Sequence, residues 1–170
     1  MSGTIKLVLV GLGLVGKRHA DVIYKTKDAK LVAVVDPCED AQNYARKKSL
    51  QIYSSLEEMF IEQSPDGILL ATPTLTHIEQ GIYCIQRNCP VMIEKPIASS
   101  SQEALVLVEK SENLGVPILV GHHRRYNPII QRANEVILSG KIGKVRAIHA
   151  NCWFYKSDEY FDVAAWRKKR

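Results

Sequence analysis

The stretch IKLVLVGLGLVG, residues 5–16, decides the fold expected for this 170-residue chain. Its first half is an apolar run with one lysine, which is typical of a buried β-strand. Glycines follow at positions 11, 13 and 16, and the apolar spacing of a helix begins at Lys17. The pattern predicts a strand, a tight turn that needs glycine, and a helix that packs back on the strand.

The same alternation of strand and helix patterns continues to residue 121. Each predicted strand is an uninterrupted apolar run, and such strands are buried on both faces of a parallel sheet. Ser55 with Glu58 three residues later predicts a helix start, and Gly115 predicts a helix end. The sequence therefore predicts an α/β fold with a Rossmann-type, doubly wound parallel sheet. The expected strands are residues 5–11, 30–36, 52–53, 66–72, 90–94 and 117–121, and the expected helices are residues 17–26, 39–48, 55–63, 75–87 and 100–115.

The pattern changes after Gly121. Residues 127–143 have helical spacing with a glycine stop, and residues 144–156 alternate like a strand with one buried face. This order predicts two domains, residues 1–121 and residues 122–170, the second being the start of an α+β open-sheet domain. About 45 residues cannot bury the face of a multi-stranded sheet. We therefore expect the chain to stop partway through this domain.

Charge is unevenly distributed between these two parts. Residues 1–121 carry 12 Lys/Arg against 14 Asp/Glu, whereas residues 122–170 carry 11 against 4, for a formal net charge of +5. A basic region can bind nucleic acid, but only WRKKR at residues 166–170 is dense here. The other basic residues do not form a stripe interleaved with aromatic residues. Ordinary surface charge or a small anionic ligand is therefore favoured over a nucleic-acid partner.

The sequence carries no targeting or metal-binding pattern. Its N-terminal apolar run is broken by glycine, is too short to span a bilayer and lacks the organisation of a signal peptide. The four cysteines form no CxxC pair and no cluster with metal-ligand spacing. We expect a cytoplasmic protein without membrane contact or bound metal. Its reduced thiols, which mostly serve packing, are Cys38, Cys84, Cys89 and Cys152.

The glycine motif follows a strand and opens a helix, which is the context of a dinucleotide-binding loop. The first glycine permits the tight turn, the second lets the backbone approach a pyrophosphate, and the third allows close packing of helix and strand. The free N–H groups and the dipole of the first helical turn also favour phosphate. The alternative is a glycine-rich turn without a ligand. The predicted cofactor-binding residues of this loop are Gly11, Leu12, Gly13, Leu14, Val15 and Gly16.

Asp36 ends the second expected strand, 20 residues after Gly16. A carboxylate there can accept hydrogen bonds from the ribose diol of an adenosine, and it repels a 2′-phosphate. No arginine follows at once, since the next residues are PCED. The pattern favours NAD over NADP as the cofactor. The alternative is that Asp36 only caps the next helix.

The segment ATPTLTH, residues 71–77, joins the fourth strand to a helix. Pro73 fixes the turn, and the hydroxyl and N–H groups of Thr72 and Thr74 can line a cofactor cleft. His77 in the first helical turn has either a structural role or a role on the cofactor side. The predicted cofactor contacts of this segment are Ala71, Thr72, Pro73, Thr74 and His77.

The fifth strand ends in Glu94, Lys95 and Pro96. One interpretation is a strand that leaves the core for an ordinary charged turn. The other is a lysine at the carboxyl edge of a parallel sheet, where open α/β sheets bind ligands. With a dinucleotide across the strand ends, Lys95 would lie beside the nicotinamide and hydrogen-bond the substrate oxygen during hydride transfer. Glu94 would orient that lysine or bind the nicotinamide ribose, and Pro96 would hold the turn.

These motifs, in this order, resemble the glucose–fructose oxidoreductase, inositol dehydrogenase and MocA family of NAD(P)-dependent oxidoreductases. The resemblance implies a two-domain enzyme that transfers hydride between NAD and a polyol, sugar or other small hydroxy compound. It implies that Lys95 is the catalytic lysine, that Arg124 lies near the nicotinamide, and that Trp166 and Arg167 reach the cofactor. It also implies a homo-oligomer formed through the sheet of the C-terminal domain. The matching segments are GLGLVGKRH (residues 11–19), Asp36, ATPTLTH (71–77), EKPIA (94–98), GHHRRYNP (121–128) and WR (166–167).

One element of the family is missing from the sequence. A glycine-rich turn leading to an Asp and a His on a helix would follow Arg170, and His122, His123 and His149 do not match it. That histidine acts as a general acid/base, so the 170-residue chain alone is expected to be inactive. Two alternatives stay open: a sensor or regulator that binds the dinucleotide without turnover, and a mature binding module without catalysis. The intact EKP sequence favours the enzyme over the sensor.

Overall fold

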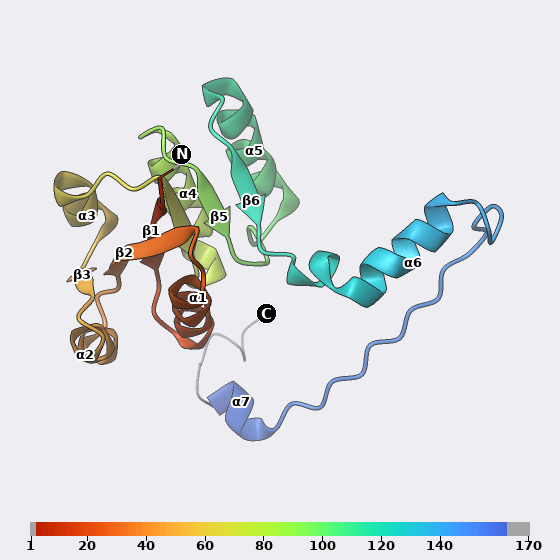
Figure 1. The fold of residues 1–170 in the computed structure, drawn as a ribbon, viewed down its shortest axis with the longest axis horizontal. Helices are drawn as coiled ribbons and strands as arrows, with labels where there is room; N and C mark the ends of the chain where they lie inside the picture. The colour runs from red at the N-terminus through yellow and green to blue at the C-terminus, as the bar shows by residue number, and fades with distance from the viewer. Residues whose placement is uncertain (1–2, 163–170) are drawn as a thin grey trace. The chain divides into compact units, whose positions relative to one another are not determined.

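A six-stranded parallel sheet forms the first part of the chain (Figure 1). The computed structural model describes residues 3–162. The spatial order of the strands is β3-β2-β1-β4-β5-β6, so the chain steps outward from β1 and then returns to place β4 on the other side of β1. The predicted Rossmann-type sheet is confirmed. The strands are β1 (Ile5–Val10), β2 (Ala29–Val35), β3 (Gln51–Tyr53), β4 (Gly67–Leu70), β5 (Val91–Ile93) and β6 (Ile118–Val120).

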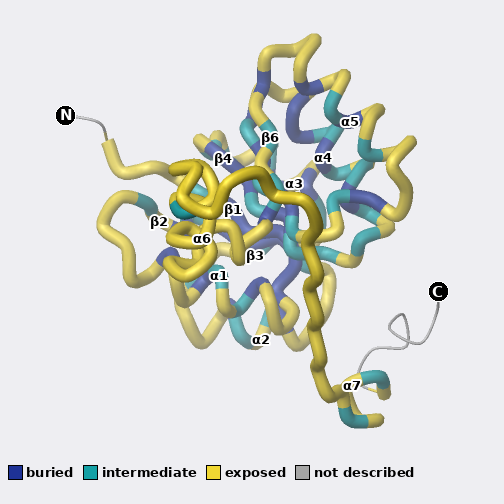
Figure 2. Tube along the Cα trace, turned by 90° about the vertical axis from the view of Figure 1, so that its right-hand side faces the viewer, coloured by how far each residue is buried: buried dark blue, intermediate teal, exposed yellow. Residues whose placement is uncertain are grey.

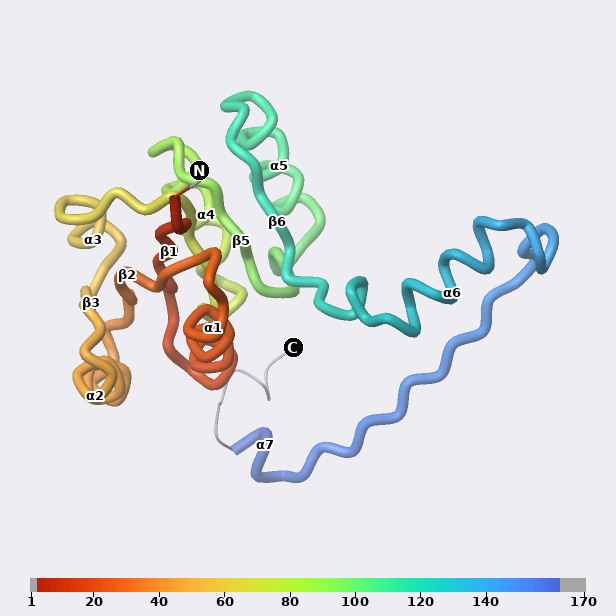
Figure 3. The backbone as a smooth tube through the Cα atoms, viewed as in Figure 1, coloured from red at the N-terminus to blue at the C-terminus, as the bar shows by residue number. Residues whose placement is uncertain are grey.

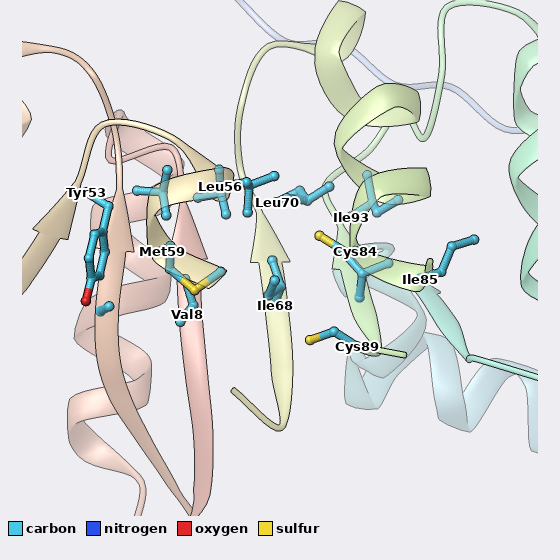
Figure 4. Packing of buried hydrophobic residues seen from close by; sticks show 14 of the residues in the cluster. Val8, Tyr53, Leu56, Met59, Ile68, Leu70, Cys84, Ile85, Cys89 and Ile93 are labelled. Atoms are coloured by element: carbon cyan, nitrogen blue, oxygen red, sulfur yellow. The ribbon is translucent and has the colours of Figure 1, made fainter. Parts of the chain in front are cut away.

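Helices pack against the sheet and create two hydrophobic cores, and Figure 2 shows the buried residues gathered along the strands and the inner sides of the helices. Because side chains alternate along a strand, β1 contributes Val8 and Val10 to one core and Leu9 to the other. The first core also contains Met59 and Ile85, drawn in Figure 4. The helices of this part are α1 (Leu14–Lys25), α2 (Glu39–Lys47), α3 (Leu56–Glu62), α4 (His77–Ile85) and α5 (Ser101–Leu114).

Local hydrogen bonds define several helix ends. The Ser55 hydroxyl accepts the Glu58 N–H at 3.2 Å, which confirms the predicted start of α3. The Glu58 carboxylate accepts hydrogen bonds from the hydroxyl and N–H of Ser54, and these bonds lower the pKa of Glu58. Helix α5 ends at Gly115, whose φ of 66° is the left-handed conformation of a glycine stop.

Two helix starts differ from the prediction. Helix α1 begins at Leu14 rather than at Lys17, because Gly13 is its N-cap and the glycine turn runs directly into the first helical turn. Gly16 therefore lies inside the helix. Because glycine has a low helix propensity, the sequence pattern did not predict a helix at this position. Before α4, residues Thr74–Thr76 form a short 3-10 helix, η1.

The described residues from Arg124 onward form a unit separate from residues 3–123, and Figure 3 traces both along the chain. Helix α6 (Pro128–Leu138) begins with proline at its first position, and Asn127 Oδ1 accepts the Ile129 N–H at 2.9 Å. Two shorter helices that the sequence did not predict are η2 (His123–Tyr126) and α7 (Asp158–Asp162).

The alternating segment 144–156 is not a strand, so this prediction is wrong. A strand exists through hydrogen bonds to a neighbouring strand, and within residues 3–162 no strand lies beside this segment. Its side chains are exposed, and Trp153 and Tyr155 are each 90% exposed. That residues 122–170 begin an α+β domain stays a prediction.

Cys84 and Cys89 are buried and free, and burial raises the pKa of the Cys89 thiol to about 11 and that of Cys84 further. Cys38 and Cys152 are exposed, so only two of the thiols serve packing. Within the described residues, no helix has both the length and the apolar character needed to cross a bilayer, and no cluster of side chains is arranged to hold a metal ion.

The central strand β4 offers a direct test of the core. Ile68 is 1% exposed and Ile61 is 84% exposed. Ile68→Ala should lower the free energy of unfolding by about 2–5 kcal/mol, because it leaves a cavity that the sheet cannot close. Ile61→Ala, the same chemical change at the surface, should stay within about 0.5 kcal/mol. Urea denaturation measures both, and equal losses would contradict the assigned core.

Candidate functional site

Four loops meet at the carboxyl edge of the sheet because the strands are parallel and in register. Val10 of β1 pairs with Val35 of β2 and with Leu70 of β4, and Leu70 pairs with Ile93 of β5. Doubly wound sheets bind ligands at this edge, where the strand order reverses between β1 and β4. The residues that directly follow these strand ends are Gly11, Asp36, Ala71 and Glu94.

Two glycines of the loop are required by the chain itself. Gly11 has a φ of 88°, and a Cβ at this position would come within 2.7 Å of the Ala71 carbonyl oxygen. A Cβ at Gly16 would collide with the Gly11 carbonyl oxygen. The loop after β1 therefore lies close against the loop after β4 and the first turn of α1. Glycine is therefore the residue that these two positions accept without distortion.

Gly13 is different, because nothing in residues 3–162 requires glycine there. Its φ of −70° suits any residue, and a Cβ at this position would have no heavy atom of these residues within 4 Å. Gly13 is the N-cap of α1, next to the first N–H groups of the helix, which have no partner inside the helix. The open space therefore lies beside a group of donors with a positive dipole, which is the environment that a phosphate needs.

Both oxygens of Asp36 hold backbone around this loop. Oδ2 accepts the Leu12 N–H at 2.7 Å, and Oδ1 accepts the Cys38 N–H at 2.9 Å. The N-cap of α2 is Cys38, not Asp36. A carboxylate offers about four acceptor positions, so two stay open for a ribose diol. Asp36 thus combines a structural role with the capacity for the predicted one.

The loop after β4 is closed by its own side chains. The Thr72 hydroxyl donates to Gln80 Oε1 of α4 at 2.7 Å, and the Thr76 hydroxyl lies 2.9 Å from the Pro73 carbonyl oxygen. The hydrogen of the Thr72 hydroxyl is therefore used in a bond to α4. These bonds keep the loop in the shape that brings Ala71 against Gly11. The predicted contacts of this loop with a cofactor would therefore use groups other than the hydrogen of the Thr72 hydroxyl.

His77 is a buried histidine with two backbone partners. Its side chain is 1% exposed, Nε2 lies 2.9 Å from the Thr72 carbonyl oxygen, and Nδ1 lies 2.9 Å from the Pro96 carbonyl oxygen. Carbonyl oxygens only accept hydrogen bonds, so both bonds form together only when both ring nitrogens carry hydrogen. His77 thus joins the loops that follow β4 and β5. This supports the structural alternative, and the predicted contact with a cofactor stays a prediction.

Glu94 is engaged by its surroundings rather than by the Lys95 ammonium. Its Oε1 lies 2.9 Å from Nε2 of His19, which is on α1, and its Oε2 accepts the Lys95 backbone N–H at 3.2 Å. A Cβ at Gly121 would lie 3.0 Å from Oε1, so this glycine makes room for the carboxylate. The Lys95–Pro96 peptide is cis, and the Lys95 side chain is exposed.

His19 is a residue whose role the sequence did not indicate. Its only signals were helical spacing and its place at the end of GLGLVGKRH, and neither names a partner 75 residues away. Three other predicted site residues stay predictions. Arg124 belongs to the second unit, where its guanidinium lies 5.3 Å from the centre of the Phe154 ring. Trp166 and Arg167 lie outside the described residues.

Known proteins are similar to this chain in sequence and in fold. The family GFO_IDH_MocA, described as an oxidoreductase family with an NAD-binding Rossmann fold, matches residues 5–122. The chain is 28% identical over 157 residues to 4-carboxy-2-hydroxymuconate-6-semialdehyde dehydrogenase of Sphingobium sp. (strain NBRC 103272 / SYK-6), covering 89% of this chain and 49% of that protein. It is 31% identical over 147 residues to scyllo-inositol 2-dehydrogenase (NAD(+)) of Bacillus subtilis (strain 168), covering 85% of this chain and 43% of that protein.

A solved structure is also similar over most of the chain. The WlbA dehydrogenase from Bordetella pertussis, in complex with NADH and UDP-GlcNAcA, matches with a TM-score of 0.91 at 29% identity. The match covers 97% of this chain and 51% of that one. The chain spans about half the length of the curated relatives it matches.

Gly13 provides the test of the phosphate position. Gly13→Val and Gly13→Thr add side chains of equal shape to the open space, and both should weaken NAD binding by about tenfold or more. Threonine caps a helix N-terminus about as well as glycine, whereas valine does not, so the threonine variant should keep the wild-type melting temperature. Titration calorimetry and thermal denaturation measure the two effects. Wild-type NAD affinity in a folded threonine variant would exclude this loop as the phosphate site.

Proposed function

The chain belongs to the Gfo/Idh/MocA oxidoreductase family, and we propose that it forms the dinucleotide-binding half of an enzyme that transfers hydride between NAD and a small hydroxy compound. The observation that carries the proposal is the carboxyl edge of the sheet. There a loop with unused space at Gly13 follows β1, the carboxylate of Asp36 follows β2, and the exposed Lys95 follows β5. The cytoplasmic location and the homo-oligomer stay predictions.

NAD is the cofactor that these residues fit. The pyrophosphate would lie at Gly13 and the N-terminus of α1, and the adenosine ribose would bind the open acceptor positions of Asp36. The loop after β4 would hold the side of the cofactor that faces Ala71 and Thr74. When bound, NAD supplies the carbon that accepts or donates hydride. The names of the Bacillus relative and the Bordetella complex, which mention NAD(+) and NADH, support this choice.

Lys95 is the residue that would act on the substrate. Within residues 3–162 the structure gives the side chain of Lys95 no hydrogen bond and no ion pair, so the fold makes no use of its charge. An ammonium beside the nicotinamide can hydrogen-bond the substrate oxygen and stabilise the negative charge that develops there. A regulator that only binds NAD has no such need, and this favours an enzyme over the alternative of a non-catalytic sensor.

The substrate class is a polyol or sugar. The Bacillus relative is named for scyllo-inositol, and the Bordetella structure contains UDP-GlcNAcA. Both compounds carry secondary hydroxyl groups of the kind that loses a proton and a hydride together on oxidation. The side chains that would select between them are expected in the part of the relatives that this chain does not cover, since it spans about half of their length.

Cofactor choice tests the role of Asp36. NAD should bind at least about tenfold more tightly than NADP, because a 2′-phosphate beside a carboxylate is repelled. Asp36→Ser should lower the ratio of the NAD affinity to the NADP affinity. The matched control is Asp66→Ser, since Asp66 Oδ2 accepts the Lys6 N–H at 2.7 Å at the other end of β1. The control loses the same kind of hydrogen bond and should keep the wild-type ratio. Equal affinities for NAD and NADP in the wild type would contradict the role.

Catalysis tests the role of Lys95. In the full-length protein, Lys95→Met should lower kcat about a hundredfold or more while NAD affinity changes little, because a preorganised donor is lost and the cofactor contacts remain. Oxidation of scyllo-inositol and of UDP-GlcNAcA with NAD provides the assay. Lys110→Met, at an exposed position of α5, is the control and should keep wild-type kcat. A Lys95→Met variant with normal kcat would leave the turn with a structural role only.

A further inference from the structure

We propose that His19 and His77 are positioning residues that hold Lys95 from both sides, and that each connects this lysine to a different cofactor-binding segment. The inference rests on the proposed function, because it concerns the same lysine. Its basis is that both neighbours of Lys95 in the chain, Glu94 and Pro96, have a histidine partner at 2.9 Å.

On the Glu94 side, the connection runs from α1. His19 lies in the second turn of the helix that the glycine loop opens, and its Nε2 meets Glu94 Oε1 at 2.9 Å. The two side chains are 23% and 15% exposed, so solvent weakens the pair only partly. The other carboxylate oxygen accepts the Lys95 N–H. Glu94 therefore transmits the position of α1 to the backbone of Lys95.

On the Pro96 side, the connection runs from the loop after β4. The imidazole of His77 lies between the Pro96 and Thr72 carbonyl oxygens, at 2.9 Å from each. Its burial shields the donating ring N–H from water, so the loss of its partner would leave a buried polar group unsatisfied, which is costly. The carbonyl groups of Thr72 and Pro96 are thus held at the two sides of one planar ring.

The two histidines have different partners, but each couples the backbone of Lys95 to a segment that would hold the cofactor. A shift of the glycine loop moves α1, His19 and Glu94, and a shift of the loop after β4 moves His77 and Pro96. In either case the backbone of Lys95 moves with the segment that would hold the cofactor. Among the described residues, Glu94 binds the backbone N–H of Lys95 rather than Nζ, and the ammonium group has no hydrogen bond or ion pair. The lysine is therefore oriented through its backbone, with its charge left for the substrate.

The test uses the reactivity of Lys95 and needs no substrate. Sulfosuccinimidyl acetate acetylates exposed lysines, and peptide mass spectrometry gives the rate at Lys95 with and without saturating NAD. In the wild type, NAD should slow acetylation of Lys95 severalfold, because the cofactor would cover the lysine. His19→Leu and His77→Phe fill the same space without donating, and in each variant this protection should fall by at least half.

Matched variants separate positioning from general stability. His19→Gln keeps an N–H donor for Glu94 and should restore protection. Ser111→Ala removes a buried hydrogen bond of the same kind as those of His77, since the Ser111 hydroxyl donates to the Val116 carbonyl at 2.6 Å far along α5. It should lower the melting temperature without changing protection. If His77→Phe does not fold, the protection of Lys95 measured in His19→Leu tests the positioning role by itself.

Three outcomes distinguish the two proposals. Loss of protection in the histidine variants, with NAD still bound in calorimetry, supports the positioning role. Wild-type protection in folded His19→Leu and His77→Phe would overturn it and leave the proposed function intact. If NAD binds the wild type but does not protect Lys95, the placement of this lysine beside the cofactor is itself wrong.

Discussion

The close approach of the Gly11 backbone to Ala71 is the constraint on which the rest of the site depends. No side chain fits between these two segments, since a Cβ at Gly11 would lie 2.7 Å from the Ala71 carbonyl oxygen. The approach follows from the register, in which Val10 and Leu70 are paired at the ends of β1 and β4. It allows the chain to turn at once into α1, so that the helix N-terminus lies at the edge of the sheet. A helix that began later would leave its donors away from this edge.

Hydrogen bonds from side chains to backbone then secure each loop at this edge. Asp36 holds Leu12 in the glycine loop, and Gln80 holds Thr72 in the loop after β4. His77 is the most buried of these groups, and its two carbonyl partners lie in separate loops. Such contacts are costly to lose in a buried environment. The loops are thus kept in place by the helices behind them, and the groups that face outward remain free for a ligand.

Much of this fold was accessible to sequence reasoning, and the reasons are local. Apolar runs separated by segments with helical spacing predicted all six strands and indicated that they form a parallel sheet with both faces covered. Ser55 and Gly115 marked helix ends because capping depends on a few neighbouring atoms. The prediction failed for residues 144–156, where alternation suggested a strand. Alternation shows that a segment suits a sheet, but only a neighbouring strand can make it one.

The sequence by itself determined the strand–glycine–helix unit, the position of Asp36 at a strand end and the presence of Lys95 after a buried strand. These features depend on residue type and spacing along the chain. Only the tertiary structure decided that Glu94 meets His19, that His77 lies between two loops, and that Gly13 alone of the three glycines faces open space. The physical reason is that these contacts join residues whose separation is set by sheet register and helix packing. Neither a residue's type nor its spacing along the chain names its partner across the sheet.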